Sequence, residues 1–362
     1  MKIEEFRSIL KSKKADFALF YSLDSSSYSP NLLYFTGYSG LGVLAIPPGK
    51  KPFLIAPAME YEKAKSCFKN TFSSEKKRLF EVLRLKLKKN RIKAKKIALD
   101  KGFVTLNFNR ILKKNLRNFK SADISAECLK LREIKTAVEI KNIKKACSIA
   151  DNIFSDLVND FKNFKTESEA AAFLEYESKK LGCDVSFPPI VASGSNSSMP
   201  HYGPKNIQFK KGFCVVDFGV RYKDYCSDMT RTLYIGKPNK KEKGLYNFLL
   251  NTQNKIIEDI KVNDKCGNIY NNCTKLLGRY EKYFTHGLGH GVGIEIHEMP
   301  NLTLNSKDKI QKNAVFTIEP GIYFQKKLGI RIEDTVLMNN NPIILTKAPK
   351  NFTVISRYRK IY

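Results

Sequence analysis

Three of the four histidines in this 362-residue sequence lie within the glycine-rich segment FTHGLGHGVGIEIHEMP at 284–300. His286 and His290 have the i, i+4 spacing of zinc-binding HExxH helices, but the glycines at every second position from 287 to 293 disfavour a helix. In an extended segment His286 and His290 share one face, whereas His297 has the opposite parity and must arrive from beyond a bend. The segment therefore predicts one histidine metal ligand, with the other histidines as helpers around it.

Two aspartates flank a polar turn in the strand-like sequence CVVDFGVRYKDYCSDMTRTLYI at 214–235. Asp217 and Asp228 are symmetric about Tyr222 and Lys223, so a hairpin centred there places them directly opposite each other, with Cβ atoms about 5 Å apart. Their apolar neighbours indicate burial. Two buried carboxylates repel each other and favour protonation unless a cation lies between them, so this pair predicts a metal ion.

A second acidic pair occurs in AVFTIEPGIYFQKKLGIRIEDTVLM at 314–338, where Glu319 and Glu333 are symmetric about Lys326. They too have apolar neighbours. Four carboxylates and one imidazole would suit two divalent ions about 3.5–4 Å apart that share a water. The two hairpins and the histidine segment together predict a dinuclear metal site.

Other interpretations of these motifs are weaker. A single histidine is more often a hydrogen-bonded core residue, but confinement of all four histidines to two short stretches favours a functional role. The glycine run lacks the GxxxxGK[ST] pattern of a phosphate loop and the GxGxxG spacing of a dinucleotide site. The DFG at 217–219 is not preceded by the HRD catalytic loop of a kinase.

The elements that must position these residues form two groups. The first 125 or so residues predict a small α/β domain, with strands at 16–23, 42–47, 52–57 and 95–100 and a helix at 80–89. Capping boxes at Thr136/Glu139 and Thr166/Glu169 predict two helices, of which the second stops at Gly182, and further helices are expected around 241–261 and 264–280. We therefore expect domains at 1–126 and 127–362.

Composition indicates a soluble globular protein, because 42% of the residues are hydrophobic and no apolar run reaches the roughly 20 residues of a membrane span. The amino-terminal segment lacks a secretory signal, and eight scattered cysteines without CxxC indicate reduced thiols, so we expect a cytoplasmic protein. The net charge of +29 would suit nucleic acid, but lysines are spread through both halves. We interpret them as solvated charge and expect neither a specific nucleic-acid partner nor a membrane partner.

Five sequence blocks, VVDFG, YCSDMTRT, HGLGHGVGIEIHE, TIEPGIY and GIRIEDT, occur in the order found in a known metallopeptidase family. They resemble the family of methionine aminopeptidase, aminopeptidase P and Xaa-Pro dipeptidase (prolidase), which has the pita-bread fold. IVASGSNSSMPHYGP at 190–204 resembles the block with a substrate-side histidine, and NLLYFTGYSGLGVL at 31–44 resembles the amino-terminal domain of the proline-specific members and of creatinase. Asp224 and Cys226 depart from the small residues that relatives often have in the turn.

The resemblance implies a fold and a set of site residues. The fold would be a creatinase-like α/β domain followed by an α+β catalytic domain with a curved antiparallel sheet flanked by helices. By the family's pattern the metal ligands would be Asp217, Asp228, His290, Glu319 and Glu333. The substrate side would be lined by His201, His286, His297 and Arg331.

The activity implied by the resemblance is that of a dinuclear metal-dependent exopeptidase, which hydrolyses Xaa-Pro bonds by attack of a hydroxide that bridges the two ions. Glu319 would carry a proton to the departing proline nitrogen, and His297 and His201 would hydrogen bond to the oxyanion and to the carboxylate end of the substrate, where Arg331 is a further candidate. Mn²⁺ is the expected metal, with Co²⁺ or Zn²⁺ as alternatives. A homodimer is expected.

Several members of the family remain open as the assignment. The amino-terminal domain favours a proline-specific peptidase over methionine aminopeptidase, and the short chain favours Xaa-Pro dipeptidase. Aminopeptidase P, acting on longer Xaa-Pro peptides, is the alternative. A metal-free binding protein of the same fold is disfavoured because such relatives lack the acidic set.

Overall fold

The computed structural model describes residues 2–23, 28–75 and 77–356. Contacts divide the chain into two compact units, Met1–Leu131 and Arg132–Tyr362. The boundary expected between residues 126 and 127 lies within helix α6 (Ser125–Glu133), which carries the chain from the first unit into the second. None of the helices in the described ranges is long and apolar enough to cross a membrane.

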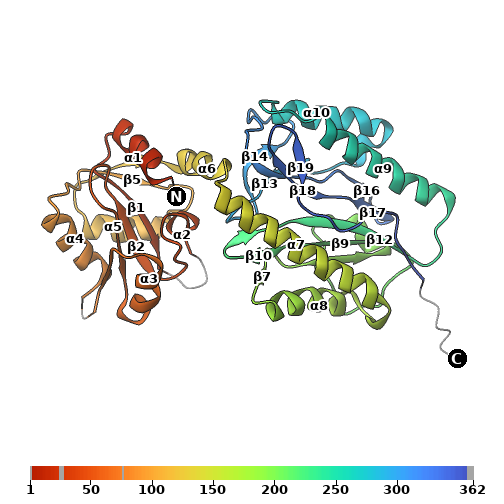
Figure 1. Ribbon diagram of the computed structural model, residues 1–362, viewed down its shortest axis with the longest axis horizontal. Coiled ribbons are helices and arrows are strands. Elements are labelled where there is room, and N and C mark those ends of the chain that lie inside the picture. Colours follow the sequence, from red (N-terminus) through yellow and green to blue (C-terminus); the bar gives the residue numbers. More distant parts are fainter. Residues whose placement is uncertain (1, 24–27, 76, 357–362) are drawn as a thin grey trace. The chain divides into compact units, whose positions relative to one another are not determined.

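The first unit is built on a six-stranded mixed sheet with the order β4-β3-β2-β1-β5-β6 (Figure 1). The central strand β1 pairs antiparallel with β2 and parallel with β5. The strands are β1 (Phe17–Ser22), β2 (Gly42–Ile46), β3 (Phe53–Ala56), β4 (Thr71–Ser73), β5 (Lys96–Leu99) and β6 (Lys120–Asp123). The helices are α1 (Ile3–Ser12), α2 (Pro30–Thr36), η1 (Ala58–Glu60), α3 (Tyr61–Cys67), α4 (Leu79–Lys89) and α5 (Leu106–Asn115).

The strands expected in this unit are confirmed as β1, β2, β3 and β5, and the expected helix is confirmed as α4. Every residue of β1, β2 and β3 is buried, because helices cover the sheet. Such strands have continuous apolar sequences instead of an alternating pattern.

The second unit contains four small sheets, with the orders β11-β10-β7, β20-β12-β9-β8, β14-β13-β15-β18-β19 and β16-β17. Its helices are α7 (Ala137–Asp160), η2 (Phe161–Asn163), α8 (Glu167–Lys180), η3 (Gly194–Ser198), α9 (Lys240–Asp259), α10 (Cys266–Leu277) and η4 (Gly278–Tyr283). Its strands are β7 (Asp184–Val185), β8 (Ile190–Ser193), β9 (Gly212–Phe218), β10 (Val220–Tyr222), β11 (Tyr225–Cys226), β12 (Met229–Ile235), β13 (Gly289–Gly291), β14 (Glu298–Leu302), β15 (Val315–Ile318), β16 (Gly321–Phe324), β17 (Leu328–Arg331), β18 (Asp334–Met338), β19 (Pro342–Ile344) and β20 (Val354–Ile355).

The two expected capping boxes differ in outcome. Thr136 and Glu139 form a complete box, in which each side chain accepts a hydrogen bond from the other's backbone N–H. Thr166 caps the N–H of Glu169, but the Glu169 carboxylate accepts from Lys165 instead of Thr166, so only half of the second box forms. Helix α8 ends at Lys180, and Gly182 has a φ of +71°, as expected for a C-terminal glycine.

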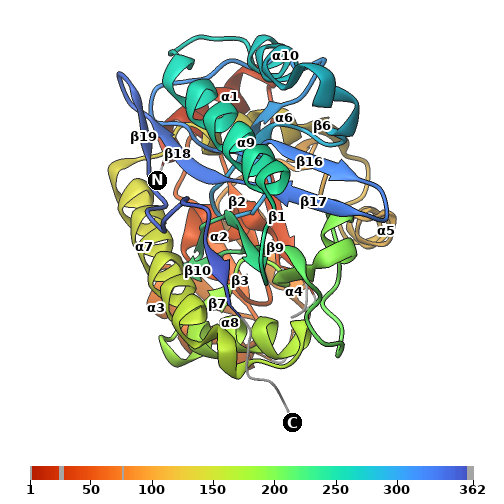
Figure 2. The same ribbon diagram turned by 90° about the vertical axis from the view of Figure 1, so that its right-hand side faces the viewer.

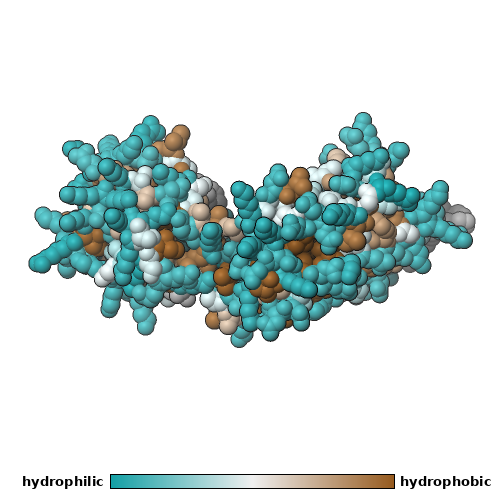
Figure 3. All heavy atoms as spheres, turned by 90° about the horizontal axis from the view of Figure 1, so that it is seen from above, coloured by the Kyte–Doolittle hydropathy of each residue, from teal (hydrophilic) through white to brown (hydrophobic). Residues whose placement is uncertain are grey.

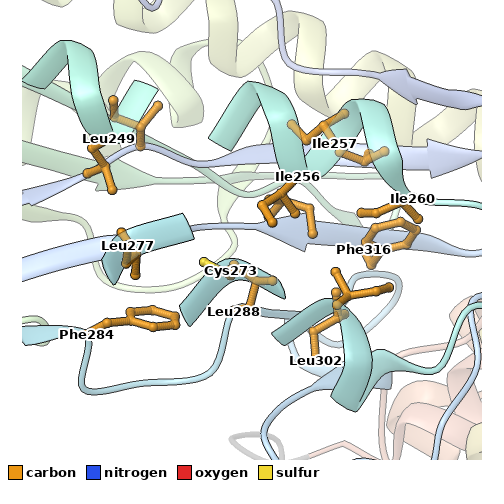
Figure 4. Close-up of a cluster of buried hydrophobic side chains, with 14 of the residues drawn as sticks. Leu249, Ile256, Ile257, Ile260, Cys273, Leu277, Phe284, Leu288, Leu302 and Phe316 are labelled. Carbon is orange, nitrogen blue, oxygen red and sulfur yellow. The ribbon is translucent and has the colours of Figure 1, made fainter. Parts of the chain in front are cut away.

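Helices cover the sheets of the second unit on two sides (Figures 1 and 2). Helices α7 and α8 pack on β8, β9 and β12, and helices α9 and α10 pack on the sheet that contains β13, β15 and β18. Figure 4 shows Leu249, Ile256 and Ile257 of α9 and Cys273 and Leu277 of α10 in the apolar cluster that also contains Leu302 and Phe316.

Strand alternation then decides which way the acidic side chains face. Val216 and Phe218 pack toward α7 and α8, so Asp217 between them points away from that layer. Ile318 and Ile332 pack toward α9 and α10, so Glu319 and Glu333 point away from theirs. The acidic side chains therefore face the space between the two layers.

Figure 3 shows a face that is mostly hydrophilic, with hydrophobic residues in limited patches. This agrees with a charged fraction of 27%.

Candidate metal centre

A cavity of about 340 Å³ in the second unit is lined by all the candidate site residues that were identified from the sequence. It is lined by Asp217, Asp228, His290, Glu319 and Glu333 and by His201, His286, His297 and Arg331. These residues come from positions that span more than a hundred residues of the chain. The residues that were expected to share one site therefore line the same cavity.

The two aspartates are closely placed but not in the expected register. Asp217 in β9 pairs with Thr230, not with Asp228, so the prediction that the aspartates are directly opposite is wrong. The residues with positive φ in the turn are Lys223 (47°) and Asp224 (68°), so the hairpin is centred one position later than the symmetry of the sequence suggested and the pairing shifts by two residues. Asp228 and Thr230 have the same parity, which leaves the two aspartates diagonal to each other on one face.

The two glutamates follow the expected register. Ile318 pairs with Asp334, and Gly321 pairs with Arg331, so both ladders continue to a position where Glu319 and Glu333 face each other. Threonines hold the two carboxylates: Thr230 Oγ1 donates to Glu333 Oε2 at 2.6 Å, and Thr317 Oγ1 donates to Glu319 Oε1 at 3.3 Å.

The histidine segment is extended at His290, as its glycines predicted. A Cβ at Gly289 or at Gly291 would collide with the backbone carbonyl of Thr317 or of Met299, so only glycine allows the neighbouring chains to approach β13 this closely. His290 Nδ1 donates to the Gly291 carbonyl at 3.1 Å, which leaves the lone pair on Nε2. That nitrogen lies 3.5 Å from Asp228 Oδ2 and 3.4 Å from Glu319 Oε1.

His297 arrives from beyond a bend, as expected from its parity. Its ring centroid lies 4.3 Å from that of His290. The side chain is exposed and lines the cavity, so it can contact a bound molecule. His201 is likewise exposed at the cavity wall.

Burial raises the pKa values of all four carboxyl groups, and repulsion by neighbouring carboxylates adds to this for Asp228, Glu319 and Glu333. The pKa values of Asp228 and Glu333 lie well above their ordinary values because of burial and then of the neighbouring carboxylates. Burial raises the pKa of Glu319 to about 7 and also raises the pKa of Asp217, against the opposing effect of Arg331. Burial lowers the pKa of His290 to about 4, so this imidazole is neutral near pH 7 and can act as a ligand.

These side chains fit divalent cations. Ligand atoms of Asp228, His290 and Glu333 lie within 4.8 Å of one another. Asp217 Oδ1 is buried and has no hydrogen-bond partner among the described residues, so this oxygen is available to coordinate a cation. Oxygen-rich donors with one imidazole match the preference of Mn²⁺-type ions.

Arg331 lines the cavity, but its guanidinium is engaged with the protein. Nη2 donates to Asp217 Oδ2 at 2.6 Å, Nε donates to Thr230 at 3.0 Å, and Nη1 donates to the Tyr323 hydroxyl at 2.8 Å and to the Pro200 carbonyl at 3.2 Å. Arg331 therefore positions Asp217 in this structure. These contacts use most of the N–H donors of its guanidinium, so few are left for the contact with a substrate carboxylate that was expected.

His286 is tied into the same network. Its Nδ1 lies 2.7 Å from the Gly287 carbonyl and its Nε2 lies 2.9 Å from the Tyr323 hydroxyl. Since a carbonyl only accepts, Nδ1 carries the proton and Tyr323 donates to Nε2. His286 is thus held in one orientation at the cavity wall.

Three supporting residues were missed by the reasoning from sequence, namely Thr230, Thr317 and Tyr323. The sequence did contain a signal for the two threonines. Thr230 lies two positions from Asp228, and Thr317 lies two positions from Glu319, so each threonine is on the same strand face as that acidic residue. The hairpin register also puts Tyr323 diagonally across from Arg331 on one face, whereas its contact with His286 depends on how more distant segments meet in space.

Comparison with known proteins agrees with this geometry. Residues 141–340 match the model of metallopeptidase family M24, and residues 2–134 match that of the creatinase/prolidase N-terminal domain. A Xaa-Pro dipeptidase of Pyrococcus furiosus is 37% identical over 317 residues, which cover 86% of this chain and 89% of the relative.

Two solved structures are similar over nearly the whole chain. An X-Pro aminopeptidase from Thermotoga maritima has a TM-score of 0.87 at 30% identity, over 95% of this chain and 99% of that one. A Xaa-Pro dipeptidase from Bacillus anthracis also has a TM-score of 0.87 at 30% identity, over 98% of this chain and 99% of that one.

Proposed function

The chain belongs to metallopeptidase family M24, with a creatinase-type amino-terminal domain and a pita-bread catalytic domain, and on that premise we propose that it hydrolyses the Xaa-Pro bond of dipeptides. The observation that carries the proposal is the convergence of four carboxylates, three of them buried and that of Glu319 partly buried, and one neutral imidazole on a single cavity. The dipeptidase from Pyrococcus furiosus is the relative that supports this substrate.

Membership of a metallopeptidase family implies divalent metal ions. Asp217, Asp228, His290, Glu319 and Glu333 would hold two of them, and Mn²⁺ is the ion that this donor set favours, with Co²⁺ or Zn²⁺ as alternatives. Bound there, such ions supply an activated water and polarise the scissile carbonyl. Proton transfer and substrate binding are the roles of the side chains of the site.

Glu319 is the carboxylate best placed to move a proton. Its side chain is 16% exposed, against 12% for Asp217 and 6% for Asp228, so it has the freest access to a bound peptide. An oxygen of Glu319 would take a proton from the attacking water and deliver it to the proline nitrogen. That nitrogen leaves poorly unless it is protonated, because it is otherwise expelled as an amide anion.

The histidines at the cavity wall would bind and orient the substrate. His297 would donate to the oxygen that becomes negative, and His201 would donate to the carboxyl end of the peptide. His286 is fixed by Tyr323 at the cavity wall. Arg331 would favour the ionised form of Asp217, against the effect of burial, and hold it in position.

The size of the cavity supports a small substrate. Ligand sites commonly measure about 300–1,000 Å³, and 340 Å³ is at the small end of that range. Aminopeptidase P activity on longer Xaa-Pro peptides is the second candidate, favoured by the similarity to the X-Pro aminopeptidase structure from Thermotoga maritima.

The proposal is tested by metal analysis and peptide hydrolysis. The purified protein is stripped with a chelator, reloaded with Mn²⁺, Co²⁺ or Zn²⁺, and assayed on Ala-Pro, with Met-Ala-Ser as a control without proline. We expect Ala-Pro cleavage that disappears with the chelator and returns with Mn²⁺. Cleavage that persists in the metal-free protein contradicts the proposal.

The proposal also covers the location of the protein and its oligomeric state. We propose a cytoplasmic location, which the free thiols of all eight cysteines support. We also propose a homodimer, which light scattering of the purified chain tests directly, since a monomer mass would contradict it.

A further inference from the structure

The loop that carries His201 is closed by one buried carboxylate. Glu167 is the first residue of helix α8, and it is fully buried. Its Oε1 accepts from the backbone N–H and the hydroxyl of Ser193, both at 2.8 Å, and from Asn196 Nδ2 at 3.0 Å. Its Oε2 accepts from the Tyr202 hydroxyl at 2.8 Å. One side chain therefore joins the start of the loop at Ser193 to its end at Tyr202.

These contacts confine the loop to one arrangement. Burial of a carboxylate is costly unless other groups replace its hydration, and in the ranges that the structure describes no lysine or arginine forms an ion pair with Glu167. Its four hydrogen bonds come from neutral donors instead, and hydrogen bonds to a charged acceptor are the stronger kind. Asn196 Nδ2 also donates to the Tyr202 hydroxyl at 3.0 Å. The set is complete only when Ser193, Asn196 and Tyr202 are all in place.

His201 lies between two anchored neighbours. The carbonyl of Pro200 accepts from Arg331 Nη1 at 3.2 Å, and the side chain of Tyr202 is held by Glu167. His201 itself is exposed and lines the cavity of the metal centre. Among the described residues no hydrogen bond holds its imidazole, so the direction of the ring depends on the backbone at 200–202.

We propose that Glu167 is a positioning residue, which orients the His201 imidazole toward the carboxyl end of the substrate by closing the loop. The inference rests on the proposed cleavage of Xaa-Pro dipeptides, in which His201 donates to that carboxylate. Glu167 is not among the residues that line the cavity, so it acts through His201 and touches no reacting atom.

The test is a double-mutant cycle on the hydrolysis of Ala-Pro by the Mn²⁺-loaded enzyme. His201→Ala removes the contact with the substrate carboxylate and should raise KM about tenfold, the size of one hydrogen bond to a charged group, with little change in kcat. Glu167→Gln weakens the closure of the loop and should raise KM by about threefold to tenfold. In the His201→Ala background it should add less than about twofold, because no imidazole remains to be positioned.

Tyr202→Phe tests the same connection with a smaller change. It keeps the ring, which packs with Ala192 and Val215, and should raise KM about twofold to fivefold through loss of the hydroxyl. Combined with His201→Ala it gives a second cycle, which decides the question if Glu167→Gln does not fold. Tyr246→Phe is the matched control, because Tyr246 is also buried and its hydroxyl donates to the Lys350 carbonyl at 3.0 Å, away from the cavity. The control should leave KM unchanged, and every variant should keep its bound metal.

The orientation of the ring can also be measured without turnover. The sequence contains four histidines, so the imidazole resonances of the Zn²⁺-loaded protein are few enough to assign by NMR with the help of His201→Ala. Glu167→Gln should shift those of His201 and leave those of His286, which is held by Tyr323, unchanged.

The outcomes separate this inference from the proposed function. An unchanged KM in Glu167→Gln, or an increase that multiplies in full with that of His201→Ala, would overturn the positioning role and leave the dipeptidase intact. Equal increases in Tyr202→Phe and Tyr246→Phe would do the same. If the wild type does not cleave Ala-Pro, the proposed function fails. A selective shift of the His201 resonances would then still support the positioning of the ring, and unchanged resonances would overturn it.

Discussion

Replacement of Glu298 by glutamine tests how the loop that carries His297 is held. Glu298 directly follows His297, and its side chain is 1% exposed. Its carboxylate lies 2.9 Å from Lys135 Nζ and 3.6 Å from Arg132 Nη1. It also accepts from the backbone N–H groups of Ile294 and Glu295, at 3.1 and 3.2 Å, so it ties both ends of the bend together.

The expected loss of stability follows from the burial of these charges. Lys135 is 1% exposed and Arg132 is 3% exposed, and Glu298→Gln removes the charge that compensates them. Loss of one partner from a buried ion pair costs about 3–5 kcal/mol. In a unit of this size each kcal/mol lowers Tm by about 2–4 °C, so the transition of the second unit should fall by about 10 °C.

Thermal and denaturant unfolding of the metal-loaded protein measure this effect. The double variant Glu298→Gln/Lys135→Met should recover part of the loss, because it also removes the lysine whose charge Glu298 compensated, while Arg132 keeps its contact with Glu295. Bound metal should be retained, since His290 lies on a different strand, and kcat should fall because His297 loses its support. A stability loss below about 1 kcal/mol would refute the argument, since it is the size of a surface ion pair.

Four further outcomes are expected. Asp228→Asn should abolish turnover and reduce bound metal, measured by elemental analysis, whereas His297→Ala should keep the metal and lose rate; full activity of both would place the site elsewhere. Arg331→Met should lower metal affinity and kcat together, because Asp217 loses its ionic partner; unchanged metal affinity would contradict that role. Burial raises the pKa of Glu298, but Lys135 and Arg132 outweigh it and hold the pKa below its ordinary 4.5. The ionised group therefore stabilises the fold above that pH and loses this contribution as the pH falls through the folded pKa, so acid titration should destabilise the wild type more than Glu298→Gln, and equal slopes would argue against it. Chelation should lower Tm, since a bound ion stabilises only the folded state, and an unchanged Tm would count against a resident metal.

Much of this protein can be predicted from local sequence. Strand alternation is a property of the backbone, so it places Asp217 and Glu333 on faces opposite their apolar neighbours whatever the tertiary structure. The glycines around His290 excluded a helix for the same local reason. The symmetry of Glu319 and Glu333 about Lys326 also predicted their register correctly.

Tertiary structure decided what depends on how segments meet. The register of Asp217 was misjudged because Lys223 and Asp224 adopt positive φ and move the turn by one position. The engagement of Arg331 by Asp217, and that of His286 by Tyr323, depend on contacts between segments that are separate in the chain. Local periodicity determines the direction in which a side chain points, but only packing determines which group it meets there.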